Sequence, residues 1–249
     1  MAKLDGIIRD DWLSGILQRD VYEIVVDEWI ERVKDETCEE YKFLRELQSK
    51  YVFMYAKVPT NFVKGFHFLE ILGFKLVDTN TVFDKPIGTT REFVGRCTVR
   101  RAVPEDRQSV VKVARGSFAY SRFHLDPQVS DSVSNEIKAK WVDNFFSGKR
   151  ADEMVVALVD GKVAAFLTLL HGGEDELTID LIAVDEKQRR KGIASDMILY
   201  AESQSTRRRI IVGTQLANIP SGRFYEKLGF RLRESYYVFH YHNFSRDGR

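Results

Sequence analysis

The 249-residue sequence lacks the features that mark several protein classes. Its two cysteines, Cys38 and Cys97, lie far apart and match no metal or redox spacing, which fits a reducing compartment. No apolar stretch reaches the length of a signal-peptide core or a membrane span. Lysines and arginines (38) balance aspartates and glutamates (37), so a net charge of +1 gives no global basis for nucleic-acid or membrane binding. We therefore expect a cytoplasmic globular protein with no nucleic-acid or membrane partner.

The sequence does carry the alternating pattern of an α/β protein, with ample residues for a sizeable core. The predicted strands are 21–26, 51–57, 74–83, 98–101, 154–159, 162–170, 177–184, 210–215 and 236–241. The predicted helices are 29–47, 62–72, 104–114, 135–146, one that starts at 193, and 221–228. The dipeptide Asp160-Gly161 between two apolar runs predicts a β-hairpin.

The segment 84–95, with one proline and two glycines, is the best linker candidate. It predicts two domains, residues 1–95 and 96–249. The two parts share an internal echo, because residues 68–76 (FLEILGFKL) resemble residues 224–232 (FYEKLGFRL), each a helix end, a glycine and a strand start. Two related halves are the more economical interpretation, although chance similarity at so common a junction is the alternative.

The most informative stretch runs from a predicted strand into a basic turn and a predicted helix. Leu181–Val184 leads to the turn Arg189–Ala194, and helical spacing begins at once. Backbone N–H groups at a helix N-terminus point the same way, and the helix dipole adds positive potential. Gly192 lets the backbone approach a ligand closely. The turn has neither the Gly-Lys-Ser/Thr end of ATPase loops nor a triple glycine. The expected ligand is a pyrophosphate.

Two motifs in order resemble the GNAT (Gcn5-related N-acetyltransferase) superfamily over roughly residues 97–243. The turn Arg189-Arg-Lys-Gly-Ile-Ala194 matches the superfamily's pyrophosphate loop. Asn218, Ser221 and Tyr225 before Gly229-Phe230 match its second signature. The resemblance implies a mixed twisted sheet flanked by helices. It also implies that the N-terminal domain is a degenerate, truncated GNAT-like half, which lacks the pyrophosphate loop and shapes the acceptor pocket.

The resemblance also implies acetyl-CoA or a related acyl-CoA as co-substrate, and no metal. The backbone of Ile182, Ala183 and Val184 is expected to pair with pantetheine. The remaining expected contacts to the coenzyme come from Arg189, Arg190, Lys191, Gly192, Ile193, Ala194, Ser195, Asn218 and Tyr225.

Direct attack of an amine on a thioester leaves two proton transfers for the enzyme to assist. The resemblance places Tyr225 at the general-acid position, with a packing role as the alternative, whereas its counterpart in the echo, Leu69, has no such chemistry. Asp180 shares a strand face with Ile182 and Val184 by alternation and is a candidate base. A structural ion pair for Asp180, a water molecule as the base, and His171 as the base remain open alternatives.

A closer likeness is to bacterial sugar-nucleotide N-acyltransferases of the TDP-fucosamine acetyltransferase type. It is carried by residues 121–123, 141–148, 214–215 and 72–79. It implies a nucleotide-linked amino sugar, a dTDP-linked amino-dideoxyhexose, as acceptor, within lipopolysaccharide, O-antigen or related surface glycan synthesis. The expected acceptor-binding residues are Tyr120, Arg122, Phe123, Thr214 and Gln215. A surface ion pair for Arg122 and core packing for the aromatic residues are the alternatives.

Other functions stay open at this point: a GNAT enzyme for another small amine or a protein N-terminus, or a CoA-binding regulatory module without turnover. Arg207–Arg209 is most simply a solvated turn. His240 and His242 lie on one strand face, but no third ligand is near in sequence, so no metal site is expected. Terminal strands of GNAT proteins often pair, so the resemblance makes a homodimer an expectation.

Overall fold

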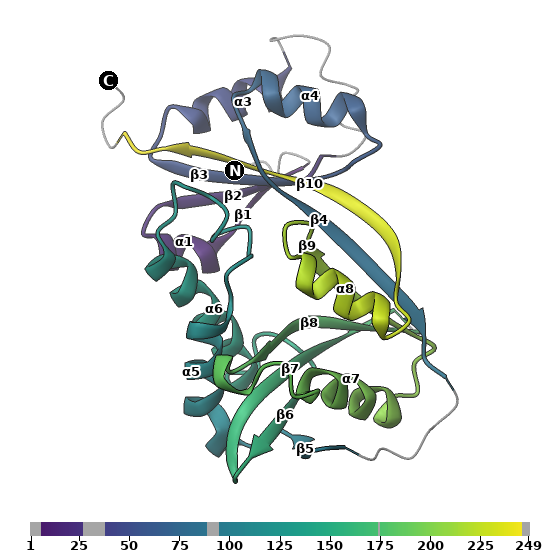
Figure 1. Ribbon diagram of the computed structural model, residues 1–249. Coiled ribbons are helices and arrows are strands. Elements are labelled where there is room, and N and C mark those ends of the chain that lie inside the picture. The colour runs from purple at the N-terminus through teal and green to yellow at the C-terminus, as the bar shows by residue number, and fades with distance from the viewer. Residues whose placement is uncertain (1–5, 27–37, 89–94, 174, 246–249) are drawn as a thin grey trace. The chain divides into compact units, whose positions relative to one another are not determined.

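The computed structural model describes residues 6–26, 38–88, 95–173 and 175–245 (Figure 1). The chain divides into two compact units. Unit 1 contains residues 1–80, 125–128 and 234–249, and unit 2 contains residues 81–124 and 129–233. Strands β4 and β10 each contribute one part to either unit.

Unit 1 is a small sheet with helices. Its elements are β1 (Ile7–Arg9), α1 (Asp11–Leu17), β2 (Asp20–Ile24), α3 (Glu39–Gln48), β3 (Val52–Pro59), α4 (Val63–Ile71), and its parts of β4 (Lys75–Pro86) and β10 (Arg231–Asn243). Neighbouring strands follow the order β1-β2-β3-β10-β4. β2 and β3 are parallel, because α3 lies between them in the chain as a crossover, whereas β10 pairs with β3 antiparallel.

Unit 2 is a larger sheet with helices on its faces. Its elements are β5 (Thr98–Arg101), the 3-10 turn η1 (Pro104–Asp106), α5 (Arg107–Ser117), α6 (Asp131–Phe146), β6 (Glu153–Val159), β7 (Lys162–Gly172), β8 (Glu176–Val184), the 3-10 turn η2 (Glu186–Gln188), α7 (Ile193–Gln204), β9 (Arg209–Gln215) and α8 (Ile219–Lys227). The strand order is β4-β9-β8-β7-β6-β5. This mixed sheet flanked by helices confirms the predicted fold class.

Both faces of the unit 2 sheet are apolar because helices cover both. On one face Val155, Leu167 and Ile179 pack with Met197 of α7 and Tyr225 of α8. On the other face the following residues pack together: Val110, Val113, Val142, Val156, Phe166 and Leu181. A sheet buried on both sides shows near-continuous apolar strands, as β6 and β7 do. Strand β8 is therefore held between two apolar cores.

The hairpin predicted at Asp160-Gly161 is confirmed. Both residues have positive φ, 51° and 72°, as a type I′ turn requires, and the turn joins β6 to β7. The strand at 98–101 is also observed at the predicted bounds. Part of the predicted helix 29–47 and part of the linker 84–95 lie outside the described residues.

Three features differ from the sequence predictions. The sequence patterns did not indicate β1 or α1, which are short; Asp10 caps α1 by accepting a hydrogen bond from the N–H of Leu13 at 2.8 Å. β4 extends to Pro86, into the segment predicted as linker. The compact units also differ from the predicted split at residue 95, because the C-terminal strand pairs with β3 and so belongs to unit 1 from Glu234 onward.

Within the described ranges, no helix combines the length and the apolar character that a membrane span needs.

Candidate functional site in unit 2

The end of β8 has one unpaired edge. β8 pairs with β9 in parallel from Glu176 to Ile179, and both strands continue beyond that pair. On its other edge β8 remains paired with β7 as far as Val184. In the described chain no strand residue pairs with the β9 side of residues 180–184. This edge therefore offers backbone groups to an extended ligand, where the sequence predicted pantetheine.

A bulge explains why the two strands separate. Leu169 pairs with Ile179 and Thr168 pairs with Leu181, so Asp180 is an extra residue in β8. The hydroxyl of Thr168 is buried and accepts a hydrogen bond from the N–H of Leu181 at 2.9 Å. A bulge bends a strand and increases its twist, which turns the last residues of β8 away from β9.

The turn after β8 presents free backbone donors where the sequence predicts a pyrophosphate ligand, and we call residues 190–195 the cradle. Arg190 and Gly192 have left-handed backbones, with φ of 63° and 84°, and α7 starts at Ile193 without a side-chain cap. No residue in the described ranges accepts a hydrogen bond from the N–H groups of residues 190–195. Six neighbouring donors without internal acceptors at a helix N-terminus suit an anion. A non-glycine residue in the left-handed region is costly and is typical of ligand sites.

Two basic side chains of the turn support it from within. Arg189 donates from Nε to the carbonyl of Val184 at 3.2 Å and from Nη2 to the carbonyl of Ser117 at 2.9 Å. Lys191 donates to Gln188 at 2.8 Å. Lys191 is therefore expected to contribute through its N–H group, whereas the N–H of Arg189 already donates to the carbonyl of Glu186 at 3.3 Å.

Arg96 lies against the cradle and was not identified from the sequence. A Cβ atom at Gly192 would stand 2.7 Å from Nη1 of Arg96, so the guanidinium occupies the space that glycine leaves. The same guanidinium donates to buried Asp196 of α7 at 2.7 Å, and the N–H of Arg96 donates to the second oxygen at 2.7 Å. The ion pair with Arg96 neutralises the negative charge of Asp196, which would otherwise disfavour an anion in the turn. Only the fold reveals this, since Arg96 precedes Gly192 by almost a hundred residues.

Tyr225 on α8 is buried among aromatic rings. Its ring lies 5.2, 5.5 and 6.2 Å from those of Phe224, Phe230 and Phe83, and 3% of the residue is exposed. Burial raises the pKa of the Tyr225 phenol well above its ordinary value, so it stays protonated at neutral pH. Among the described residues its hydroxyl has no hydrogen-bond partner. The phenol thus holds an uncommitted proton, as a general acid needs.

The segment between β9 and α8 is organised by Asn218. This residue caps α8, accepting a hydrogen bond from the N–H of Ser221 at 3.3 Å, and its amide lies 3.4 Å from the hydroxyl of Thr214. The N–H of Asn218 donates to the carbonyl of Gln215 at 2.9 Å. The structure therefore brings together three of the predicted site residues, Thr214, Gln215 and Asn218, at the end of β9.

Asp180 has the partners of a structural ion pair. Its carboxylate accepts two bonds from Arg150, at 2.7 and 3.0 Å, and one from the indole of Trp141 at 3.0 Å. A bidentate guanidinium pair holds a carboxylate firmly and occupies its lone pairs. Of the alternatives for Asp180, the contacts favour the ion pair over the base. His171, the second base candidate, bonds to Glu153 at 2.8 Å in an exposed pair.

Three of the predicted acceptor residues, Tyr120, Arg122 and Phe123, lie on the irregular segment between α5 and α6, whereas Thr214 and Gln215 end β9. Tyr120 is 39% exposed, whereas Phe123 is buried beneath the guanidinium of Arg122, whose Cζ is 4.7 Å from the ring centroid. Ser121 and His124 hold the segment in shape: the Ser121 hydroxyl bonds to the His124 ring at 2.6 Å, and the ring bonds to Asn135 at 3.0 Å. Arg122 and Tyr120 are thus presented on an anchored turn.

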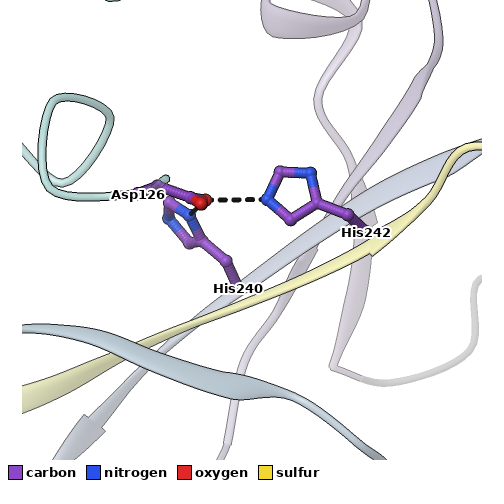
Figure 2. A group of neighbouring side chains, drawn as sticks. All are labelled: Asp126, His240 and His242. Carbon is purple, nitrogen blue, oxygen red and sulfur yellow. Dashed lines mark hydrogen bonds and ion pairs between the residues drawn. The ribbon is translucent and has the colours of Figure 1, made fainter. Parts of the chain in front are cut away.

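Unit 1 contains a second cluster, shown in Figure 2. His240 and His242 of β10 both bond to the same oxygen of Asp126, at 2.5 and 2.7 Å. The sequence argument against a metal relied on the lack of a third ligand nearby, but Asp126 brings a carboxylate from 114 residues away. Such a donor is visible only after folding.

Hydrogen bonds account for the protons of the Asp126 cluster without a metal. Arg19 donates to Nδ1 of His242 at 2.9 Å, so the other ring nitrogen carries the proton that Asp126 accepts. Metal binding through that nitrogen would move the proton to Nδ1, against the Arg19 donor. Burial alone would raise the pKa of Asp126, but hydrogen bonds from His240, His242 and the N–H of Gln128 outweigh it and lower that pKa. Through Asp126, the two histidines hold residues 125–128 against β10, and we call this group of contacts the Asp126 clasp. The absence of a metal stays a prediction.

Comparison with known proteins agrees with the geometry of unit 2. Residues 120–230 match the model of the acetyltransferase (GNAT) family. The spore coat polysaccharide biosynthesis protein SpsD of Bacillus subtilis is 37% identical over 141 residues, which are 55% of this chain and 48% of that protein. The chain thus spans about half the length of this curated relative.

Solved structures share the fold at low identity. A conserved protein of unknown function from Staphylococcus epidermidis superposes with a TM-score of 0.64 at 15% identity, over 98% of this chain and 93% of that one. A GCN5-related N-acetyltransferase from Sphaerobacter thermophilus gives 0.60 at 12% identity, over 89% and 73%. The open edge of β8, the free N–H groups of its turn and these matches agree with one another: residues 120–230 of this chain match the GNAT acetyltransferase family.

Proposed function

We propose that the protein transfers an acetyl or short hydroxyacyl group from acyl-CoA to the amine of a dTDP-linked amino-dideoxyhexose. The acyl donor and the acceptor bind together, and the amine attacks the thioester directly. The product would serve the synthesis of a surface glycan such as O-antigen, which fits a cytoplasmic enzyme.

One observation carries the donor half of this proposal: an unpaired strand edge is followed, after the 3-10 turn η2, by a turn whose six N–H groups have no acceptor among the described residues. The edge at residues 182–184 offers hydrogen bonds to the amides of pantetheine. The turn at residues 190–195 offers its donors to the pyrophosphate, with Arg96 beside it. A ligand with amides at one end and a pyrophosphate at the other is what this sequence of groups would bind.

The reaction needs orientation and two proton transfers. The amine nitrogen forms a bond to the thioester carbon, the carbon–sulfur bond breaks, and the sulfur leaves with the electron pair. Tyr225 gives its proton to that sulfur, which produces CoA thiol. The acylated nitrogen still carries one extra proton, and its loss to the phenolate gives the amide and restores the phenol of Tyr225. Because Arg150 and Trp141 occupy Asp180, we assign the removal of the ammonium proton to a water molecule.

The acceptor half rests on the similarity to SpsD and on the residues that face solvent in the acceptor segment. SpsD is named for spore coat polysaccharide synthesis, and its likeness supports a sugar acceptor. Tyr120 is exposed beside Arg122, a pair of side chains that suits a sugar nucleotide by stacking and by charge. Thr214 and Gln215 are proposed to complete the acceptor site.

The test is release of CoA thiol from acetyl-CoA in the presence of candidate acceptors. We expect turnover with a dTDP-linked 3-amino or 4-amino dideoxyhexose, and little with the UDP-linked sugar or the free amino sugar. Turnover on a peptide N-terminus or another amine instead would replace the acceptor assignment. Tight acetyl-CoA binding with no turnover on any amine would indicate a regulatory CoA-binding module.

The variant Asp180→Asn separates the two assignments of the base. If water accepts the proton, the pH profile of kcat/KM keeps its shape and only its height falls, since the variant weakens the Arg150 pair. Loss of the acidic limb of the profile would return the base to Asp180.

A further inference from the structure

Arg96 holds its guanidinium beside the cradle in a fixed position. Two hydrogen bonds of 2.7 Å hold it: the N–H of Arg96 donates to one carboxylate oxygen of Asp196, and Nη1 donates to the other. Within the described ranges, Nε and Nη2 have no acceptor, and 68% of the side chain is exposed. Because a guanidinium has five N–H donors in a rigid fork, most of the donors of Arg96 are available to a ligand.

Asp196 explains why an exposed arginine stays in one position. It lies in the first turn of α7, and only 1% of the residue is exposed. A buried carboxylate that loses its charged partner is strongly destabilising, so folding itself selects the conformation in which Arg96 reaches Asp196. A side chain that is ordered before binding loses little conformational entropy when a ligand arrives.

The guanidinium and the backbone donors of the cradle lie next to one another. A Cβ atom at Gly192 would stand 2.7 Å from Nη1, 3.1 Å from Cζ and 3.3 Å from Cδ of Arg96, so the arginine packs on the backbone of Gly192. The N–H groups of residues 190–195 have no acceptor in the described chain. An anion that accepts hydrogen bonds from the N–H groups beside Gly192 therefore lies within reach of Arg96.

Arg96 supplies a charge that backbone groups cannot supply. A helix N-terminus provides about half an elementary charge, whereas a guanidinium carries a full charge and matches two oxygens of a phosphate at once. The ion pair with Asp196 uses only part of the fork. Two other basic side chains of the turn are engaged within the chain, since Arg189 bonds to two carbonyl groups and Lys191 bonds to Gln188. The fixed, partly used guanidinium of Arg96 therefore suits a phosphate group.

We propose that Arg96 binds a phosphate group of the acyl donor and acts together with the backbone donors of the cradle. It thereby makes the enzyme select donors that carry the nucleotide end of CoA over shorter pantetheine thioesters. This inference rests on the proposed function for the identity of the donor, whereas the anion-binding role rests on the contacts of Arg96. The pyrophosphate and the ribose 3′-phosphate of CoA share this chemistry, and the experiment separates them.

The main variant removes both charges, Arg96→Met with Asp196→Asn, because removing the arginine alone would leave a buried carboxylate without a partner. The matched control is Arg100→Met with Asp106→Asn. Arg100 donates to buried Asp106 at 2.6 and 2.9 Å, and the N–H of Val103 donates to the same carboxylate at 2.8 Å. Arg96→Lys keeps a charged partner for Asp196 and carries the test where the main variant does not fold.

Thermal melts establish that each variant folds, and calorimetry measures the binding of three probes. The probes are acetyl-CoA, dephospho-acetyl-CoA, which lacks the 3′-phosphate, and inorganic pyrophosphate. If the pyrophosphate of the donor is the partner of Arg96, all three probes bind the main variant more weakly than wild type. If the 3′-phosphate is the partner, only acetyl-CoA does.

We expect the main variant to bind acetyl-CoA about tenfold to a hundredfold more weakly than wild type, the range for hydrogen bonds to a charged group. The control should stay within a few fold of wild type. Arg96→Lys should lose about fivefold or more, because one ammonium group cannot bond to Asp196 and match two phosphate oxygens at once.

Equal affinity of wild type and the main variant for acetyl-CoA would overturn the role of Arg96, as would an equal loss in the control. A loss for both CoA forms without a loss for pyrophosphate would also overturn it, because the contact would then involve the adenosine. Pyrophosphate binding that depends on Arg96, in a protein that does not bind acetyl-CoA, would leave the anion role standing and end the donor assignment. Turnover of the dTDP-sugar by a main variant with unchanged acetyl-CoA affinity would leave the proposed function standing and end the role of Arg96.

Discussion

The two echo segments of this chain share one backbone design but have different chemistry. In the first, α4 ends at Gly73 and β4 follows; in the second, α8 ends at Gly229 and β10 follows. The glycines have φ of 82° and 86°. The N–H of Phe74 bonds to Leu69 at 2.9 Å, and that of Phe230 bonds to Tyr225 at 3.0 Å. The same helix-ending bonds thus place a leucine at one site and a phenol at the other.

The comparison extends to the strands before each segment. In unit 1, β2 and β3 are parallel with α3 between them in the chain, as β8 and β9 are with α7 between them in unit 2. The final strands differ in partner, since β10 pairs with β3, whereas β4 neighbours β9. Related local designs therefore do not imply two active sites; we propose that only the copy with the glycine turn and the phenol is active.

The largest expected effect concerns the pair Tyr225 and Leu69. Tyr225→Phe should lower kcat about 10²- to 10⁴-fold, the usual contribution of a general acid, while acetyl-CoA still binds. Leu69→Tyr should add no activity to the Tyr225→Phe variant. Thiol release and calorimetry measure the two quantities. Turnover like that of wild type in Tyr225→Phe would leave this tyrosine with only a packing role.

The next effect concerns Gly192, for which Gly73 is the matched control. Gly192→Ala places a methyl group 2.7 Å from Arg96 and forces alanine to φ of 84°, a cost of about 1–2 kcal/mol. We expect acetyl-CoA affinity to fall roughly tenfold or more. Gly73→Ala meets no atom closer than 3.8 Å and should leave that affinity unchanged. Equal affinity in both variants would remove the cradle from the donor site.

The third prediction concerns Asp126, the buried carboxylate that bonds to His240 and His242 in unit 1. Asp126→Asn should lower the free energy of unfolding by about 1–3 kcal/mol, because both carboxylate oxygens accept hydrogen bonds, one from the two histidines and one from the N–H of Gln128, and the amide keeps only one of these oxygens. The pKa of Asp126 is lowered by folding, so its stabilisation is complete above the unfolded pKa of about 4 and is lost as the pH falls toward the folded value. Denaturant titrations from pH 7 to pH 3 should show this loss in wild type and less of it in Asp126→Asn. An identical pH dependence in both proteins would contradict the clasp.

The smallest effect compares the two helix-ending glycines directly. Gly73→Ala and Gly229→Ala should each cost about 1 kcal/mol of stability, because both residues have left-handed backbones without nearby atoms to clash with. Only Gly229→Ala should also lower turnover, since its helix carries Tyr225. Thermal melts and thiol release provide the two measurements, and a loss of turnover in both variants would argue against a single active site.

Much of the fold was accessible from local patterns. The hairpin at Asp160-Gly161, the strand 98–101 and the helix–glycine–strand echo depend on backbone preferences that a few residues set by themselves. The turn from Arg189 to Ala194 was also predicted, because a glycine at a helix start is a local feature. By contrast, β1 and α1 contain too few residues for periodicity to show them.

The sequence by itself determined the α/β class, the glycine turn at residues 189–194 and the residues that carry the family resemblance, since each depends on neighbours within a few positions. Only the tertiary structure decided which side chains met: Arg96 beside Gly192, Arg150 on Asp180, and Asp126 between His240 and His242. It also decided that β10 completes unit 1. These contacts join residues far apart in the chain, and their free energy comes from burial and charge pairing that no local pattern records.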